Sequence, residues 1–270
     1  MEKDSSTSHP VIEVKNLTMS YDDRIIQQDL SFTVNRGDVF IIIGTSGSGK
    51  STLMRHMIGL NRPTAGEVYY DGVDFWNLPP AQRQQLMRRF GVLYQGGALW
   101  SSMTLAENVA LPLEEYTELT RSEIADLVTF KLALVGLVGF EDYYPSEISG
   151  GMRKRAGLAR AMALDPDILF FDEPSGGLDP INSRMLDDLI IELRDSLGST
   201  LVVVTHELAS IFAIVTNSVF LDTKSRTMIA AGDPGQLLAE SDDPRVQRFL
   251  TRGDSNHASA DRTAEGGQTR

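Results

Sequence analysis

The amino-acid sequence predicts an α/β fold into which a small helical subdomain is inserted. A glycine-rich loop at residues 44–52 follows a short apolar run and precedes a helical stretch. Continuous apolar runs, which are typical of strands buried in parallel sheets, recur along the chain and end in polar residues. Between two such runs, residues 103–148 show helical periodicity and no strand signal, which indicates the inserted subdomain.

The composition is that of a globular chain without covalent cross-links. Of the 270 residues 41% are hydrophobic and none is cysteine, so neither a disulfide framework nor a thiolate metal site is available. The formal net charge of −12 argues against a nucleic-acid-binding surface. The longest apolar stretch, Leu132–Phe140, is far shorter than the roughly 18 residues that a membrane span needs. A membrane role would therefore require a partner that supplies the spans.

Two strands precede the glycine-rich loop. Residues 11–19 alternate apolar and polar side chains, and residues 25–34 carry a second strand after a turn at Asp22 and Asp23. Tyr21 lies just before this turn, where an aromatic ring could stack on an adenine, although its position alone favours packing on the core. The apolar run 39–43 then indicates a buried strand that leads into the loop.

The loop has the spacing G-x-x-x-x-G-K-[ST] of a phosphate-binding loop. Its residues are Gly44, Thr45, Ser46, Gly47, Ser48, Gly49, Lys50, Ser51 and Thr52. Glycines let the backbone curl and turn its N–H groups inward, where they and the positive end of the following helix can bind phosphate. We expect Lys50 to reach the β- and γ-phosphates of a nucleotide and the Ser51 hydroxyl to bind Mg²⁺.

A short strand, a short helix and a buried strand follow the loop. Residues 66–72 indicate a strand that ends in an Asp-Gly turn, residues 79–89 a helix, and residues 90–94 a buried strand. Gln95 comes at the carboxyl end of that last strand, where ligands bind in open α/β sheets. It is a candidate to contact Mg²⁺ or water, but on position alone a turn residue is the better interpretation.

The helical insertion leads into a helix with an unusual cationic start. Residues 132–140 are expected in the core of the insertion rather than in a membrane anchor. Ser149 is a good N-cap for a helix that continues to residue 163. Arg153, Lys154 and Arg155 then oppose the helix dipole. Either an anion at the free N–H groups compensates them, or they are solvated charges on an exposed face.

Two later strands also end in polar residues. The apolar run 167–171 delivers Asp172 and Glu173, two carboxylates that are costly at such a place without a cation. We expect Asp172 to hold Mg²⁺ and Glu173 to polarise the water that attacks a γ-phosphate, the alternative being a pair that caps the next helix. His206 follows the strand 201–204, and this place favours contact with the γ-phosphate over a purely structural role.

The rest of the chain is expected to close the fold. A turn at residues 175–180 precedes a helix with one apolar face made of Met185, Leu186, Leu189, Ile190 and Leu193. Strands at 219–222 and 227–230 and short helices at 233–239 and 244–250 follow. We expect flexible ends at residues 1–10 and 251–270, because the first segment is polar and the second contains no large apolar residue.

Taken together, these motifs resemble those of the ATP-binding cassette (ABC) ATPases over residues 11–250. Gly44–Thr52 matches the Walker A motif, Ile168–Glu173 the Walker B motif, and Ile148–Met152 the signature motif, with Met152 in place of the usual glutamine. The single-residue matches are Tyr21 for the adenine-stacking aromatic, Gln95 for the Q-loop, Asp179 for the D-loop and His206 for the H-loop.

This resemblance implies a fold, a pair of cofactors and a mechanism. The fold is a P-loop ATPase with a mainly parallel core sheet, an antiparallel β subdomain and a helical subdomain at about residues 103–149. The cofactors are ATP and Mg²⁺, with Ser51, Gln95 and Asp172 at the metal and Glu173, His206 and Gln95 in catalysis. Two copies would meet head to tail, so that Ser149, Gly150, Gly151 and Asp179 of one copy face the ATP of the other.

Four further stretches resemble the ATPase subunits of the Mla phospholipid transporters. They are Tyr94–Trp100, Asn108–Leu113, Tyr144–Glu147 and Asp243–Leu250, and Ser149–Met152 agrees as well. The resemblance implies a peripheral protein on the cytoplasmic face of the inner membrane that serves outer-membrane lipid asymmetry. The implied partners are membrane permease subunits, a small STAS-domain protein and an MCE-domain substrate-binding protein, and no nucleic acid.

Other functions remain open from the residues alone. A cassette ATPase could serve import or export of another substrate, or act as a soluble ATPase in translation or DNA repair. Translation proteins of this kind commonly carry two cassettes, and only about 100 residues separate Lys50 from Ser149, too few for the long coiled coil of a repair protein. A phosphate-loop kinase would have no use for the Ser-Gly-Gly helix start.

The permease is expected to dock where the core and the helical subdomain meet. Leu99, Trp100 and Met103 supply apolar surface there, and a large apolar side chain is a usual anchor of an interface. The alternative is that Trp100 belongs to the subdomain core.

Overall fold

The core of the molecule is a mainly parallel sheet, as the sequence predicts. A computed structural model describes residues 10–251, so the segments 1–9 and 252–270, most of the ends expected to be flexible, lie outside the described residues. The six-stranded sheet has the order β10-β9-β3-β8-β7-β6, and only β10 runs antiparallel to its neighbour. Its strands are β3 (Val39–Gly44), β6 (Phe90–Leu93), β7 (Ile168–Asp172), β8 (Thr200–Val204), β9 (Asn217–Asp222) and β10 (Thr227–Gly232).

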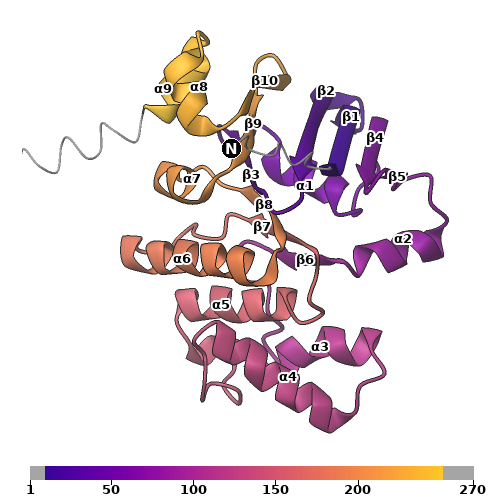
Figure 1. The fold of residues 1–270 in the computed structure, drawn as a ribbon, viewed down its shortest axis with the longest axis vertical. Coiled ribbons are helices and arrows are strands. Elements are labelled where there is room, and N and C mark those ends of the chain that lie inside the picture. The colour runs from indigo at the N-terminus through magenta and orange to yellow at the C-terminus, as the bar shows by residue number, and fades with distance from the viewer. Residues whose placement is uncertain (1–9, 252–270) are drawn as a thin grey trace, which may run out of the picture.

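A second, antiparallel sheet packs beside the first, which confirms the fold class (Figure 1). Its order is β2-β1-β4-β5, and all its pairings are antiparallel. The strands are β1 (Pro10–Tyr21), β2 (Arg24–Asn35), β4 (Ala65–Tyr70) and β5 (Val73–Asp74). The backbone N–H of Gln28 in β2 donates to the carbonyl of Arg226 at 2.8 Å, so this sheet is also tied to the turn between β9 and β10.

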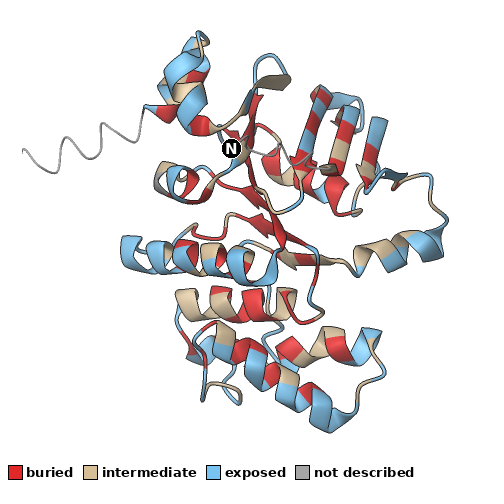
Figure 2. Ribbon diagram, in the orientation of Figure 1, coloured by how far each residue is buried: buried red, intermediate tan, exposed pale blue. Residues whose placement is uncertain are grey.

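The two faces of the core sheet bury two separate hydrophobic clusters. Successive side chains of a strand point to opposite faces. In β3, Phe40 and Ile42 pack toward the antiparallel sheet and helix α1 (Lys50–Met57), whereas Ile41 and Ile43 pack toward the helices on the other face. Figure 2 shows β3, β7 and β8 as buried over their length. The burial of β3 on both faces explains its unbroken apolar sequence.

The segment without strand signals forms helices, as expected. Helix α2 (Pro80–Met87) precedes β6, and the insertion contains α3 (Leu105–Tyr116), α4 (Arg121–Leu134) and the short 3-10 helix η1 (Pro145–Glu147) before α5 (Gly150–Ala161). Capping boxes begin α3 and α4, because Thr104 and Thr120 each exchange hydrogen bonds with a glutamate three residues later. No helix between residues 10 and 251 is long and apolar enough to cross a membrane.

The apolar stretch 132–140 packs in the core of the insertion. Leu132 and Leu137 have no exposed surface, whereas Val138 is exposed. Helix α4 ends at Leu134, so the second half of the stretch is loop rather than helix. The prediction of a core segment therefore holds for most of its apolar side chains.

Four further helices complete the described chain. They are α6 (Pro180–Leu197), α7 (Leu208–Ile214), α8 (Pro234–Glu240) and α9 (Pro244–Leu250). In α6 the predicted apolar face is buried at Leu186, Ile190 and Leu193, but the inclusion of Met185 was wrong, since its side chain is 52% exposed. Met185 lies one residue, about 100° of helix rotation, away from Leu186 and so falls outside the buried stripe.

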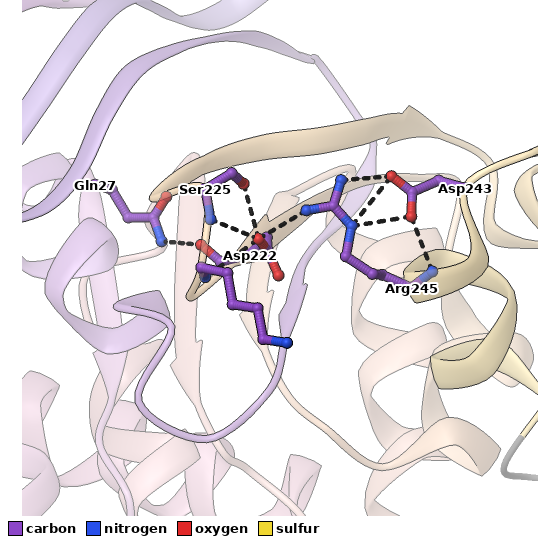
Figure 3. A network of polar contacts seen from close by, with 6 residues as sticks. Gln27, Asp222, Ser225, Asp243 and Arg245 are labelled. Atoms are coloured by element: carbon purple, nitrogen blue, oxygen red, sulfur yellow. Dashed lines mark hydrogen bonds and ion pairs between the residues drawn. The ribbon is translucent and has the colours of Figure 1, made fainter.

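The C-terminal helix is fastened to the core sheet by one arginine (Figure 3). Arg245 of α9 binds the N-cap residue Asp243 at 2.6 Å and the β9 residue Asp222 at 2.9 Å. The Arg245 guanidinium lowers the pKa of Asp243 to about 2. The Asp222 carboxylate also accepts bonds from the backbone and the hydroxyl of Ser225. As a result α9 and the end of β9 form one ordered unit.

Candidate nucleotide-binding site

The glycine-rich loop joins β3 to α1 in the strand–loop–helix order that the sequence predicts. Gly44, Gly47 and Gly49 all have positive φ, at 156°, 78° and 90°, which glycine adopts without strain. A Cβ on Gly44 would lie 2.5 Å from the Ser48 hydroxyl oxygen and 2.6 Å from the carbonyl of Leu221. The loop therefore curls against the end of β9 too closely for any side chain at position 44.

Lys50 lies inside this loop. Its Nζ donates to the carbonyls of Gly44 and Thr45, at 2.9 and 3.3 Å, and the side chain is almost completely buried. Burial lowers the pKa of Lys50, while the nearby carboxylates of Glu173 and Asp172 raise it. These carboxylates favour the charged ammonium, which lies against the carbonyls of Gly44 and Thr45.

A hydroxyl and a carboxylate meet beside the loop. The Ser51 hydroxyl, in the first turn of α1, donates to Oδ1 of Asp172 at the carboxyl end of β7, at 2.8 Å. The sheet order places β7 two strands from β3, so residues 121 positions apart come together at one edge. Both groups offer oxygen atoms, which are the ligands that Mg²⁺ prefers.

The next acidic residue is held by the histidine. Nδ1 of His206 and Oε1 of Glu173 are 2.9 Å apart, whereas Oε2 of Glu173 is buried and accepts no hydrogen bond from the residues that the structure describes. Glu173 has φ = 51°, in the left-handed region that is uncommon for a non-glycine residue. The sequence placed both side chains at the same edge of the sheet but gave no signal that they pair directly.

Two predicted residues lie at the border of this cluster. Gln95 is exposed, two residues beyond the end of β6, and within residues 10–251 it forms no hydrogen bond to Ser51 or Asp172. Tyr21 ends β1 and is 47% exposed. Met19, on the same strand, would lie 3.3 Å from a Cβ on Gly49, so the end of β1 runs beside the loop and an exposed ring there is free to receive a base.

The signature residues form a second cluster. Ser149 caps α5, and its hydroxyl oxygen accepts from the backbone N–H of Met152 at 3.2 Å. A Cβ on Gly151 would lie 3.4 Å from Oδ1 of Asn182, so the start of α5 contacts the start of α6. Within residues 10–251 no hydrogen bond joins residues 149–151 to residues 44–52.

Asp179 belongs to this second cluster. Its Oδ1 accepts from the backbone N–H groups of Ile181 and Asn182, both at 3.1 Å, and so caps α6. The hydrogen bond from the Asn182 side chain lowers the pKa of Asp179, and the two backbone N–H groups add to the effect. Asp179 is therefore ionised and fixed in place at the N-terminus of α6.

The three cations in α5 do not form the solvated face that one alternative expects. Arg153 donates to the carbonyl of Ile148 at 2.9 Å, and Arg155 to that of Val135 at 3.0 Å. The Nζ of Lys154 donates to the carbonyl of Glu173 at 3.3 Å and also to that of Gly176. Backbone carbonyls thus accept from all three side chains, which therefore do not form a solvated face, and an anion at the N–H groups of the helix start stays a prediction. These hydrogen bonds could not be predicted from the sequence, because any backbone carbonyl can accept one.

The family follows from the comparison of this sequence with known families. The sequence profile described as "ABC transporter" matches residues 27–176, more than half of the chain, including the loop, Asp172 and Glu173. This chain belongs to the ABC transporter family. It is an ATP-binding subunit of that family, an ABC ATPase.

Relatives in several bacteria are similar over most of this ABC ATPase. The intermembrane phospholipid transport system ATP-binding protein MlaF of Haemophilus influenzae is 41% identical over 246 residues, which are 91% of this chain and 92% of that protein. MlaF of Escherichia coli strain K12 is 40% identical, over 89% and 88%. The probable ribonucleotide transport ATP-binding protein mkl of Mycobacterium bovis is 43% identical over 88% of this chain. The matched region spans only 66% of the length of that mycobacterial protein.

Solved ABC cassettes have the same fold. A dimeric post-hydrolysis state of the ATP-binding cassette MJ0796, bound to ADP and Pi, is 28% identical with a TM-score of 0.75, and covers 82% of this chain and 98% of that one. The cbiO1 protein of Clostridium perfringens, part of the transporter complex cbiONQ, is 25% identical with a TM-score of 0.77, over 90% and 94%.

Proposed function

We propose that this ABC ATPase hydrolyses ATP to drive the movement of phospholipids between the inner and outer membranes, and so maintains outer-membrane lipid asymmetry. The observation that carries the proposal is the convergence of Lys50, Ser51, Asp172, Glu173 and His206 at one edge of the core sheet. The similarity to MlaF over nearly the full length of both proteins supports the substrate class. Residues 11–250 form the ATPase domain in this proposal.

The nucleotide would be held by the loop and by the end of β1. The N–H groups of residues 44–52 and the Lys50 ammonium bind the phosphates, and Tyr21 stacks on the adenine. Ser51 and Asp172, already in contact at 2.8 Å, fit a Mg²⁺ ion by their oxygen chemistry, and Gln95 is the further ligand. When bound, the ion supplies neutralisation of the phosphate charge.

The paired side chains of Glu173 and His206 would carry out the hydrolysis of ATP. Glu173 accepts the proton of the attacking water, because Oε1 is occupied by His206 and Oε2 is the carboxylate atom left to act. The His206 side chain is 60% exposed and so can reach the γ-phosphate while it orients Glu173. Gln95 positions the water at the edge of the same cluster.

The second cluster would act on a neighbouring copy. Ser149, Gly150 and Gly151 start a long helix, and N–H groups at such an end bind phosphate. Since they contact the start of α6 and not the loop of their own chain, they and Asp179 complete the ATP site of a second copy in a head-to-tail dimer. The MJ0796 cassette, similar in fold, is described as a dimer.

The membrane partners would dock on the helical subdomain. A groove of about 820 Å³ lies between α3 and α4, with Met103, Ala110, Ile124 and Val128 among its lining residues. Three acidic side chains, Glu107, Glu114 and Glu141, and one basic side chain, Arg121, also line it, so its charged groups are mainly acidic. An apolar groove with acidic groups suits a basic amphipathic segment of a permease. Permease subunits, a STAS-domain protein and an MCE-domain protein would hold the ATPase on the cytoplasmic face of the inner membrane.

A ribonucleotide is the competing substrate, since the mkl protein carries that name and is 43% identical. We favour phospholipid because the match spans 92% of MlaF in one species and only 66% of mkl. A transport measurement separates the two.

Reconstitution with the permease tests the proposal. Vesicles that contain the whole complex should move a fluorescent phospholipid when ATP is added, and should not take up a labelled ribonucleotide. Glu173→Gln should bind ATP as tightly as wild type and hydrolyse it at least ~100-fold more slowly, because an amide cannot accept the proton. Ribonucleotide uptake without phospholipid movement would overturn the substrate assignment. Hydrolysis at the wild-type rate in Glu173→Gln would remove Glu173 from the chemistry.

A further inference from the structure

Gln27 is a buried glutamine of β2 that lies between the glycine-rich loop and the end of β9, and Figure 3 shows its bond to Asp222. It has no exposed surface, and its Nε2 donates to the carbonyl of Ser48 at 2.8 Å and to that of Asp222 at 3.0 Å. Burying an amide is costly unless it is hydrogen-bonded, so the two bonds account for its presence among apolar neighbours.

The orientation of this amide is fixed by its partners. Both partners are carbonyl oxygens, which only accept, so the NH₂ group of Gln27 must face them and both of its protons are used. Oε1 points away and is buried without a partner among residues 10–251. The side chain therefore acts as a two-pronged donor that ties the loop to β9.

The bond to Ser48 has a consequence for the loop. In a planar trans peptide the C=O and the N–H point in opposite directions. Because the Ser48 carbonyl is held toward Gln27, the N–H of Gly49 faces the other way, away from Gln27. A Cβ on Gly49 would lie 2.9 Å from Cγ2 of Ile26 and 3.4 Å from Cγ of Gln27, so β2 packs directly against this peptide.

The second bond supplies a fixed anchor. The carbonyl of Asp222 accepts this second hydrogen bond from Gln27, and the Asp222 side chain is itself held by Arg245 of α9 and by Ser225. The Ser48–Gly49 peptide is thus held in place by the core sheet and the C-terminal helix, and not by the loop alone.

We propose that Gln27 is a positioning residue for nucleotide binding, which turns the Gly49 N–H toward the phosphates of ATP. The inference rests on the proposed role of residues 44–52 in holding those phosphates. It assigns a function in the site to a strand residue that does not belong to any of the sequence motifs.

The test compares Gln27→Met with Gln28→Met in the full 270-residue chain. Methionine keeps the length and removes both donors, and Gln28 lies next in the strand, partly exposed, with its side chain on the other face. In Gln27→Met the Kd for ATP and for ADP should rise about tenfold, and KM should rise by more than kcat falls. The shift of the Gly49 amide signal on ADP binding, in ¹⁵N NMR spectra, should fall to less than half. Gln28→Met should match wild type in its Kd values, in KM and kcat, and in the shift of the Gly49 amide signal.

A wild-type Kd in Gln27→Met would overturn the inference, as would a raised Kd with an unchanged Gly49 response. If that variant does not fold, Gln27→Asn replaces it, because the amide one methylene shorter cannot reach both carbonyls and should raise Kd at least threefold. A wild-type Kd there would also overturn the inference. If the wild-type complex moves no phospholipid, the proposed substrate is wrong but the inference about Gln27 is unaffected. If the wild-type chain binds no ATP, the proposed function itself is wrong, and the role of Gln27 with it.

Discussion

Lys154 is a nearly fully buried cation that reaches from α5 to the backbone of Glu173 and Gly176. Burial lowers its pKa, and the carboxylates of Glu207 and Glu173 raise it. Its two acceptors flank the turn in which Glu173 takes its left-handed conformation. Strain of this kind persists only where the surroundings hold it, and Lys154 is one such restraint.

We therefore predict that Lys154→Met lowers kcat about tenfold or more while the Kd for ATP changes little, because the base moves and the loop does not. Steady-state ATPase assays of the assembled complex and nucleotide titrations measure both. Arg155→Met is the matched control, since Arg155 donates to carbonyls at residues 135 and 136, away from Glu173. Equal losses in the two variants would point to destabilisation of α5 and not to positioning of Glu173.

The same residues show what sequence can and cannot give at this scale. The convergence of Lys50, Ser51, Asp172, Glu173 and His206 at one edge could be predicted, because each follows a buried strand or a fixed loop spacing. The carbonyls that accept from Lys154 and Gln27 could not be predicted, because every residue has a backbone carbonyl and its residue type does not show which one accepts.

At the scale of elements, the contact of α6 with α7 buries an acidic residue. The Ser210 hydroxyl donates to Oδ2 of Asp187 at 2.7 Å, and Oδ1 of Asp187 is buried without a partner among the described residues. Burial raises the pKa of Asp187 against the opposing effect of the Ser210 bond, and the neighbouring carboxylates of Glu207 and Asp188 raise it further. The ionised form is thus disfavoured in the folded state.

The sign of the pH effect follows from linkage. A carboxyl whose folded pKa is raised contributes stability below its unfolded pKa of about 4 and loses it as the pH rises through the folded value. Asp187→Asn does not titrate, and its amide oxygen can still accept from Ser210. We predict that Tm of Asp187→Asn exceeds that of wild type by about 2–4 °C at pH 8, and that the difference shrinks toward pH 4.5. Thermal unfolding at both pH values measures it, and a pH-independent difference would contradict the account.

The sequence predicts no element where periodicity carries no information. Residues 208–214, which form α7, have six apolar residues of seven, and so short a run cannot be distinguished from a buried strand. The strands of the core were predicted because their apolar runs end in polar residues at one edge. Helices α3 and α4 were predicted because their apolar spacing continues over several turns.

At the scale of the whole molecule, the two residue clusters and the groove are proposed to contact different partners, a second copy of the chain and a permease. The loop cluster and the signature cluster are not joined by hydrogen bonds within residues 10–251, and in the proposed dimer each signature cluster completes the ATP site of the other copy. The groove between α3 and α4 belongs to the same helical subdomain as the signature helix. If the permease docks in the groove as proposed, a force that it applies there would reach Ser149 through packed helices.

Trp100 stands beside this groove with 59% of its surface exposed, so the alternative that it belongs to the subdomain core is wrong. The amide of Asn108 in α3 holds its backbone, with the Trp100 N–H donating to Oδ1 at 2.8 Å and the Trp100 carbonyl accepting from Nδ2 at 3.1 Å. Met103, three residues on, lines the groove itself. The indole is thus presented to solvent on a fixed backbone, as an anchor for a docked segment is.

We predict that Trp100→Glu leaves ATP binding and Tm of the isolated chain unchanged but breaks its association with the permease, because a buried charge would replace an apolar anchor beside acidic groups. Co-purification and phospholipid movement in reconstituted vesicles measure the loss. Phe212→Glu is the matched control, since Phe212 is 43% exposed on α7, which α5 and α6 separate from the groove (Figure 1). Assembly and transport at wild-type levels in Trp100→Glu would place the permease elsewhere. A matching loss in Phe212→Glu would show that any surface charge impairs assembly, so the docking site would have to be mapped from α7 as well.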